Sequence, residues 1–171
     1  LKSIGLSAFS GTAITSITIP KSVEKMKCSF CNCTQIQTFE IESGSKLRSI
    51  KNLFNNCFKL KNVKIPEECS IKLIESKIFE DKTSNDIYIP STVEALENDW
   101  YNGISNVILS SNNPHFKYAD NEKRIIIGKS DINNEEYYAL IYVNPKAKCL
   151  IIPENVTRNK FVFSQSNSIK S

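Results

Sequence analysis

Hydrophobic positions recur in a fixed order over residues 1–109. The clearest copy covers residues 54–74, with the spacing F-x-x-C-x-x-L-x-x-V-x-I-P followed by two apolar positions three residues apart. An aromatic residue opens each copy and recurs every 21 to 25 residues. These aromatic residues are Phe9, Phe30, Phe54, Phe79 and Trp100. A chain that repeats itself with this period is typical of a repeat array.

Each copy contains a triplet in which an apolar, a variable and an apolar residue follow one another. The triplets are residues 17–19, 39–41, 63–65, 87–89 and 107–109. A period of two predicts a short strand with one buried face. Strands of this length are not stable alone, so we expect them to stack as parallel rungs around a continuous core.

A proline follows three of these strands and is expected to begin a turn. The prolines are Pro20, Pro66 and Pro90. An apolar pair after the turn predicts a second short extended segment. The pairs are Val23 and Met26, Leu47 and Ile50, Ile71 and Ile74, and Val93 and Leu96. The aromatic residue then belongs to an irregular or single-turn helical segment, such as residues 51–56.

The repeat pattern stops at Leu109. Within residues 110–150, the strand-like runs 124–128 and 137–143 are separated by a polar stretch, which predicts an inserted antiparallel hairpin. The repeat is expected to resume at Ile151, Ile152 and Pro153, and residues after Val156 form an imperfect repeat and a polar tail. We therefore expect one repeat solenoid over 1–171, with about five repeats in 1–109. Its first residues resemble the middle of a repeat, so a fragment of a longer chain is expected.

Composition narrows the class of protein further. The 171 residues are 40% hydrophobic and 23% charged, which is typical of a folded chain. The sequence has no apolar run long enough for a transmembrane helix, and its first residues are not expected to form a signal peptide. The net charge is +4, but the basic residues are scattered, whereas nucleic-acid binding surfaces usually cluster them.

Catalytic chemistry is poorly represented. The single histidine, His115, follows a proline in an expected turn, and no nucleophile or phosphate-binding motif is present. The paired carboxylates Glu67 and Glu68 are expected to lie in a loop and face solvent. The sequence therefore favours a non-enzymatic protein that needs no cofactor.

Two of the six cysteines fall in the repeat itself. Cys33 and Cys57 lie three residues after the aromatic position, where the first copy has Thr12. A small side chain with a weak donor suits a buried site facing a loop carbonyl, so both are expected to be buried and reduced. Cys28 and Cys31 form a C-x-x-C pair, for which chance clustering, a disulfide and a metal site all stay open. No zinc site is expected, because the cysteines do not make a convincing set of four ligands.

The copy from Ala8 to Val23 resembles the leucine-rich repeat of BspA-like surface antigens. The stretches 113–116 and 140–145 also resemble the segment that often interrupts the repeats of that family. The resemblance implies an α/β-type leucine-rich repeat solenoid, horseshoe-like, whose strands line a concave face. It also implies a place on the cell surface or in secretion, and adhesion or binding to a host or extracellular-matrix protein.

If the apolar residues of each triplet point inward, the residues between and before them point outward. Stacking then forms two columns on the concave face, which we expect to be the partner-binding surface. The middle column is Thr18, Glu40, Lys64, Tyr88 and Ile108, and the flanking column is Ser16, Thr38, Asn62, Asp86 and Asn106. Glu40 and Lys64 are expected to pair across rungs. The alternatives are a structural spacer array that displays another binding region, and an intracellular scaffold repeat.

Overall fold

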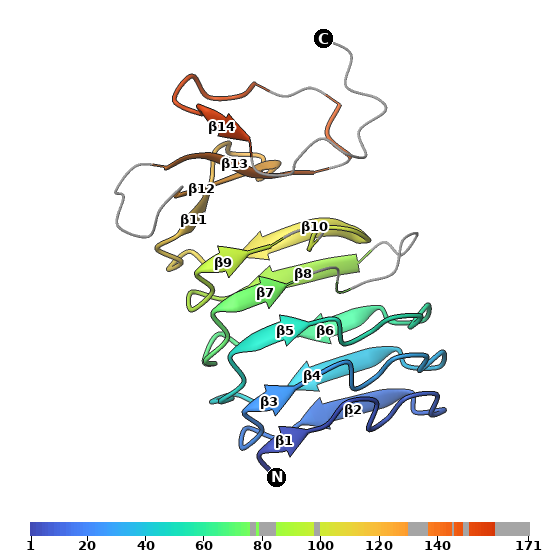
Figure 1. Ribbon diagram of the computed structural model, residues 1–171. Helices are drawn as coiled ribbons and strands as arrows, with labels where there is room; N and C mark the ends of the chain where they lie inside the picture. Colours follow the sequence, from blue (N-terminus) through green and yellow to red (C-terminus); the bar gives the residue numbers. More distant parts are fainter. Residues whose placement is uncertain are drawn as a thin grey trace.

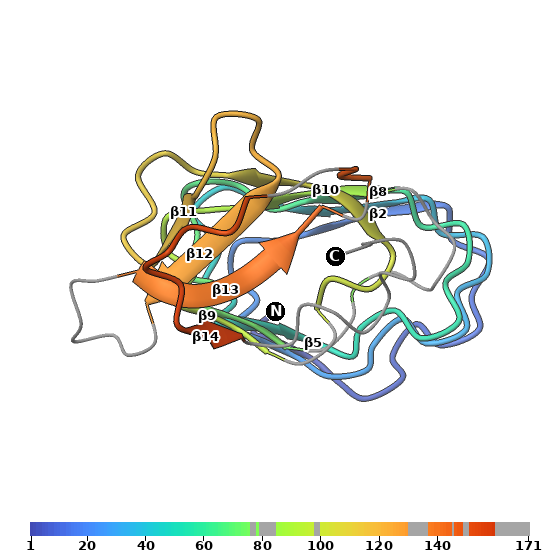
Figure 2. The ribbon, with the colours of Figure 1, turned by 90° about the horizontal axis from the view of Figure 1, so that it is seen from above.

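The computed structural model describes residues 1–75, 78, 85–97, 100–129, 137–144, 146–148 and 151–159. It is a stack of rungs in which each turn of the chain contributes one strand to each of two facing layers (Figure 1). The view along the stack shows the two layers running side by side, joined by turns at both ends (Figure 2). The core lies between them.

The first layer is a parallel five-stranded sheet with the order β10-β8-β6-β4-β2. Its strands are β2 (Ser16–Ile19), β4 (Thr38–Ile41), β6 (Asn62–Lys64), β8 (Asn85–Ile89) and β10 (Ile104–Leu109). The register pairs Ile17 with Phe39, Phe39 with Val63, Val63 with Ile87 and Ile87 with Val107. This register confirms the alignment of the repeats that the sequence predicts.

The second layer, which we call the short-strand layer, forms from the predicted second segments. It contains β1 (Ser3–Ile4), β3 (Lys25–Met26), β5 (Ser49–Lys51), β7 (Leu73–Glu75) and β9 (Ala95–Leu96). β1 pairs with β3, and β5, β7 and β9 form a separate three-stranded sheet. All of these pairings are parallel, as expected for successive rungs.

An aromatic column fills one end of the core. Phe9 stacks on Phe30 with ring centroids 5.1 Å apart, and Phe30 stacks on Phe54 at 5.9 Å. Phe39 packs its ring edge against Phe54 at 4.8 Å. These offset and edge contacts are favoured geometries for aromatic rings, so the repeated aromatic position ties successive rungs together. The anchor at position 79 lies outside the described residues.

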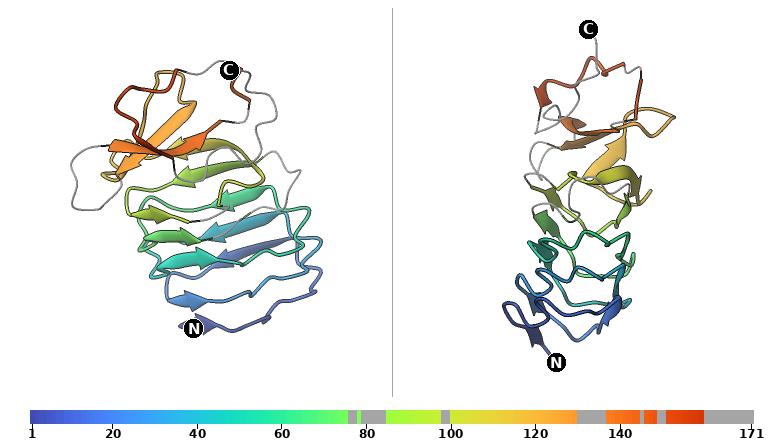
Figure 3. Two further views of the ribbon diagram at one scale, coloured as in Figure 1. Left: turned by 45° about the horizontal axis from the view of Figure 1, so that its top comes forward. Right: turned by 90° about the vertical axis from the view of Figure 1, so that its right-hand side faces the viewer.

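The segments that carry the aromatic residue are turns, and the described residues contain no helix. The short helical form that we considered for these segments is therefore wrong there. Figure 3 shows the rungs stacked one above another, and the horseshoe shape that the resemblance implies is not confirmed.

Backbone geometry explains why no helix forms. Two positions in each early repeat, two residues before and two residues after the aromatic, have positive φ. They are Ser7 (56°), Cys28 (41°) and Asn52 (46°), then Gly11 (71°), Asn32 (61°) and Asn56 (60°). A left-handed residue reverses the chain and ends any right-handed turn, and glycine and asparagine tolerate it best.

The cysteine position joins one rung to the next. The Cys33 thiol donates to the carbonyl of Phe9 at 2.9 Å, and the Cys57 thiol donates to that of Phe30 at 3.0 Å. In the first copy, the Thr12 hydroxyl donates to the Phe9 carbonyl at 2.8 Å. Cys33 and Cys57 are buried thiols that form no disulfide, which confirms their predicted structural role.

Three strands of the insert and one strand that follows it form a four-stranded sheet with the order β11-β12-β13-β14. Its strands are β11 (Phe116–Tyr118), β12 (Ile125–Lys129), β13 (Tyr137–Val143) and β14 (Arg158–Asn159). β12 and β13 are antiparallel, as the hairpin prediction requires. β11 and β14 were not predicted, because the apolar pattern of β11 is too short to identify without its pairing partner and β14 has none.

We expected the repeat to resume at Ile151 and Ile152, but the structure has no strand at these residues. Both residues are exposed and lie outside every strand of the described chain. The turn after them does match the repeat, since the Val156 amide donates to the Pro153 carbonyl at 3.0 Å as Val23 does to Pro20. β14, which corresponds in the repeat to the short strand β3, then pairs with β13, and Ile151 and Ile152 belong to no strand among the described residues.

Candidate functional site

The ten residues of the two predicted columns all lie on the five-stranded sheet. Register places Thr18 beside Glu40, and Glu40 beside Lys64, in the middle column. Tyr88 lies beside Ile108 further along the same column. The flanking column contains Ser16, Thr38, Asn62, Asp86 and Asn106, and the structure pairs Ser16 with Thr38, Thr38 with Asn62, and Asp86 with Asn106.

None of the ten side chains is part of the hydrophobic core, and all are exposed or half-buried. Ile108 is the most apolar of them and is 46% exposed. An apolar side chain with this exposure contributes little to folding and is available to a partner.

Glu40 and Lys64 form the predicted ion pair across adjacent rungs. The Lys64 side chain is 66% exposed, so solvent screens the attraction and the pair is worth about 0.2–1 kcal/mol. Its main effect is to fix two opposite charges at known places on the sheet.

Tyr88 is held by a carboxylate that sequence reasoning placed in solvent. Its hydroxyl donates to Glu67 Oε2 at 2.7 Å, and Glu67 also accepts from the Ser91 amide at 3.3 Å and the Ser110 hydroxyl at 3.1 Å. Glu67 is half-buried, which corrects our expectation for this residue. The position of Glu67 directly after Pro66 could have indicated this burial, because the turn that begins there runs beside the next rung.

These contacts shift the protonation equilibria of both partners. Hydrogen bonds from Ser91 and then from Tyr88 stabilise the carboxylate and hold the pKa of Glu67 below its ordinary value, although burial opposes them. Burial, followed by the hydrogen bond to Glu67, raises the pKa of Tyr88. Tyr88 is therefore a neutral donor at physiological pH, and its ring is fixed at one position on the sheet.

A hollow of about 300 Å³ opens on this face between β6 and β8. β6 and β8 share one registered pair, Val63 with Ile87, whereas β2 and β4 share four. The loosened pairing leaves space at this level of the stack. Five column residues line it, namely Asn62, Lys64, Asp86, Tyr88 and Ile108. The hollow thus combines a cation, a carboxylate, an aromatic ring and an apolar side chain.

The other side chains that the sequence offered for chemistry do not form a common site. Burial lowers the pKa of His115, and the strongest opposing influence is the charge of Glu94. Cys28 and Cys31 are free thiols, and burial raises the pKa of Cys31, which disfavours a reactive thiolate.

Within the described part of the chain, no group of three or more histidine, cysteine, aspartate or glutamate residues could hold a metal ion. No helix among the described residues has the length and apolarity to cross a bilayer.

Parallel short strands, buried aromatic positions and turn-forming ends define a β-solenoid repeat protein. The model of the BspA type leucine-rich repeat region matches residues 1–108 in six copies. The chain therefore belongs to the BspA-type leucine-rich repeat family. A search of curated proteins finds no match to the chain.

Solved structures show the same fold. The leucine-rich repeat protein TpLRR of T. pallidum is 23% identical with a TM-score of 0.54, over 63% of this chain and 51% of that one. The pneumococcal vaccine antigen PcpA is 18% identical with a TM-score of 0.56, over 86% of this chain and 46% of that one. The chain thus spans about half the length of these two structures.

Proposed function

We propose that this chain is a non-enzymatic protein-binding module whose partner docks on the outer face of the five-stranded sheet. The observation that carries the proposal is the hollow between β6 and β8, since five of the ten column residues meet there. A binding site gains most from a few anchors in a desolvated centre, and Tyr88 and Ile108 provide an aromatic and an aliphatic anchor at this place.

Charge on the hollow would give the partner its orientation. Lys64 and Asp86 carry opposite charges on neighbouring strands, so a partner with the complementary pair would dock in one register. Tyr88 is preorganised by Glu67, which reduces the side-chain entropy that binding would otherwise cost. Such a surface suits a folded or extended protein ligand better than a small molecule, because the hollow is shallow and mixed in polarity.

The proposal extends to display on a cell surface or in secretion, and to adhesion through a host or extracellular-matrix protein. Family membership and the description of PcpA as a vaccine antigen support this extension. A structural spacer that displays another binding region is the second candidate, favoured by the polar character of the columns near β2 and β4.

The test compares two double variants by surface plasmon resonance against a panel of purified extracellular-matrix proteins. Lys64→Ala with Tyr88→Ala removes two residues of the hollow. Phe58→Ala with Lys61→Ala is the matched control, because it removes an aromatic and a lysine side chain from exposed positions that lie outside the strands and do not line the hollow.

We expect wild type and control to bind a panel protein and the Lys64/Tyr88 variant to lose at least about tenfold in affinity. Circular dichroism should be the same for all three proteins. A partner that binds the Lys64/Tyr88 variant as well as wild type would overturn the assignment of the site. If no panel protein binds wild type, the spacer is favoured instead.

A further inference from the structure

The short-strand layer is open at one level. Its strands pair in register from β1 to β3 and from β5 through β7 to β9, but no registered pair joins β3 and β5 in the described chain. The two rungs stay connected at both ends of these strands. The backbone amide of Lys46 donates to the Lys21 carbonyl, and the backbone amide of Phe30 donates to the Leu53 carbonyl, each at 3.1 Å. The opening is therefore confined to the strands themselves.

Met26 is uncovered at this opening. It occupies the apolar position that is filled by Ile50, Ile74 and Leu96 in later repeats, where the side chains are no more than 5% exposed. Met26 is only half-buried and lines a hollow of about 700 Å³ that β1, β3 and β5 border, with Ile4 and Leu47 among the other lining residues. Methionine is flexible and polarisable, and proteins use it at surfaces that adapt to varied apolar ligands.

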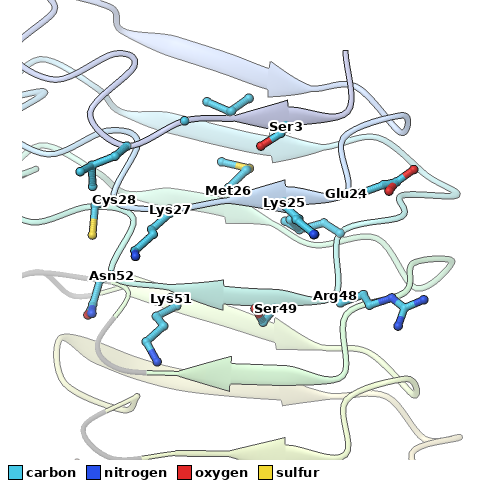
Figure 4. Close-up of a pocket in the computed structure, with 14 residues that line it drawn as sticks. Ser3, Glu24, Lys25, Met26, Lys27, Cys28, Arg48, Ser49, Lys51 and Asn52 are labelled. Carbon is cyan, nitrogen blue, oxygen red and sulfur yellow. The ribbon is translucent and has the colours of Figure 1, made fainter.

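The rim of this hollow is basic. Lys25, Lys27, Arg48 and Lys51 border it, and Figure 4 shows them distributed along the two rungs on either side of the opening. Lys51 pairs with Glu75. Lys25, Lys27 and Arg48 have no acidic partner in the part of the chain that the structure describes.

Among the described residues that line the hollow, the one acidic residue already has a partner. Glu24 lies 3.8 Å from the Lys2 ammonium, and a single carboxylate cannot balance Lys25, Lys27 and Arg48 together. The rim therefore has a surplus of positive charge above an apolar floor. This combination selects a ligand that is acidic and also carries an apolar side chain.

The spacing of the rungs decides how such a ligand lies. Cα atoms of β3 and β5 approach within 8 Å, whereas a strand inserted between them would need about 9.5 Å, twice the usual strand spacing. The sheet therefore has no space for an added strand. A ligand lies across the opening from outside and inserts side chains.

We propose that this hollow binds an extended acidic segment of a partner protein, with an apolar side chain packed on Met26. Carboxylates of the segment then contact Lys25, Lys27 and Arg48. This site lies on the layer opposite the five-stranded sheet and shares no residue with the site of the proposed function. Either proposal can therefore be overturned without affecting the other.

The test uses fluorescence anisotropy with a labelled short peptide that alternates glutamate and leucine. Lys25→Glu with Lys27→Glu reverses two exposed rim charges. Lys59→Glu with Lys61→Glu is the matched control, because it has the same spacing, the same change in net charge and exposed positions away from the hollow. Met26→Ala tests the apolar floor, and a glutamate–serine peptide tests the apolar side chain of the ligand.

We expect the glutamate–leucine peptide to bind wild type and the Lys59/Lys61 variant within about twofold of each other. The Lys25/Lys27 variant should bind at least about tenfold more weakly, and added salt should weaken the wild-type complex. Met26→Ala and the glutamate–serine peptide should each lower affinity at least about threefold.

Three outcomes would overturn the proposal. The first is absence of peptide binding to wild type at low salt, and the second is equal binding by the two charge-reversal variants. The third is a result in which wild type binds phosphatidylserine vesicles, the Lys25/Lys27 variant does not, and wild type binds the glutamate–leucine and glutamate–serine peptides equally. That result would assign the basic rim to a membrane surface. Circular dichroism spectra that match wild type ensure that each variant is folded.

Discussion

The hydroxyl of Tyr88 donates a 2.7 Å hydrogen bond to the carboxylate of Glu67, 21 residues earlier in the chain. The bond joins the turn of one rung to the outer face of the next and fixes the aromatic ring at the hollow between β6 and β8. Because the Ser110 hydroxyl binds the same carboxylate, Glu67 connects three successive rungs.

Replacing Glu67 should destabilise the stack. Glu67→Ala removes the acceptor of the Tyr88 and Ser110 hydroxyls, and these partly buried donors would lose their partner. We expect the free energy of unfolding to fall by about 1–2 kcal/mol in urea denaturation. Glu68→Ala is the control, since Glu68 is exposed and its loss should change stability by less than about 0.5 kcal/mol. Equal effects of the two substitutions would contradict the role given to Glu67.

The same carboxylate should make stability depend on pH. The pKa of Glu67 is lower in the folded chain than its ordinary value of 4.5, so the folded state favours the carboxylate. Its contribution is present above the unfolded pKa and is lost as pH falls through the folded pKa. The stability difference between wild type and Glu67→Gln should therefore be constant near neutral pH and decrease below pH 4.5. A difference that grows on acidification would show that the shift has the opposite sign.

The aromatic column predicts a large loss of stability when Phe54 is removed. Phe54 is 3% exposed and contacts both Phe30 and Phe39, so Phe54→Ala should leave a cavity and cost about 3–5 kcal/mol. Phe58→Ala serves as the control, because Phe58 is 59% exposed and should cost less than about 1 kcal/mol. Thermal and urea unfolding measure both. An unchanged melting temperature for Phe54→Ala would contradict the repeat alignment.

Four of the six thiols should react in two groups. Cys28 and Cys31 are half-buried, whereas Cys33 and Cys57 are buried and donate to the carbonyls of Phe9 and Phe30. Iodoacetamide labelling of the native protein, mapped by mass spectrometry, should modify Cys28 and Cys31 first. Cys33 and Cys57 should react only as fast as the chain opens. Rapid native labelling of Cys57 would argue against a closed core at that rung.

The columns were predictable because they depend on local alternation alone. When Phe39 and Ile41 point into the core, Glu40 must point out, and the same holds for Lys64 between Val63 and Ile65. The cysteine position was predictable for a similar reason, since Thr12 in the first copy showed the small donor that the turn requires.

The hollows and their supporting contacts were not predictable in this way. The sequence places Glu67 in a turn, but its bond to Ser110 crosses 43 residues of chain. Likewise, Lys25 and Arg48 line one hollow because β3 and β5 do not pair, and no pattern within either segment encodes that absence. β14 escaped prediction because Arg158 and Asn159 are not apolar, and its pairing with β13 is a tertiary contact.

The sequence by itself determined the repeat, the inward and outward faces of each strand, and the stacking order of the rungs. These follow from the period of two and from the need to bury one face of a short strand. Tertiary structure decided how closely neighbouring rungs approach, and so where each layer opens. That spacing depends on backbone pairing and side-chain bonds between residues far apart in the chain. The tight contact of β2 with β4, the loosened β6–β8 pair and the gap at Met26 are therefore seen only in the folded stack.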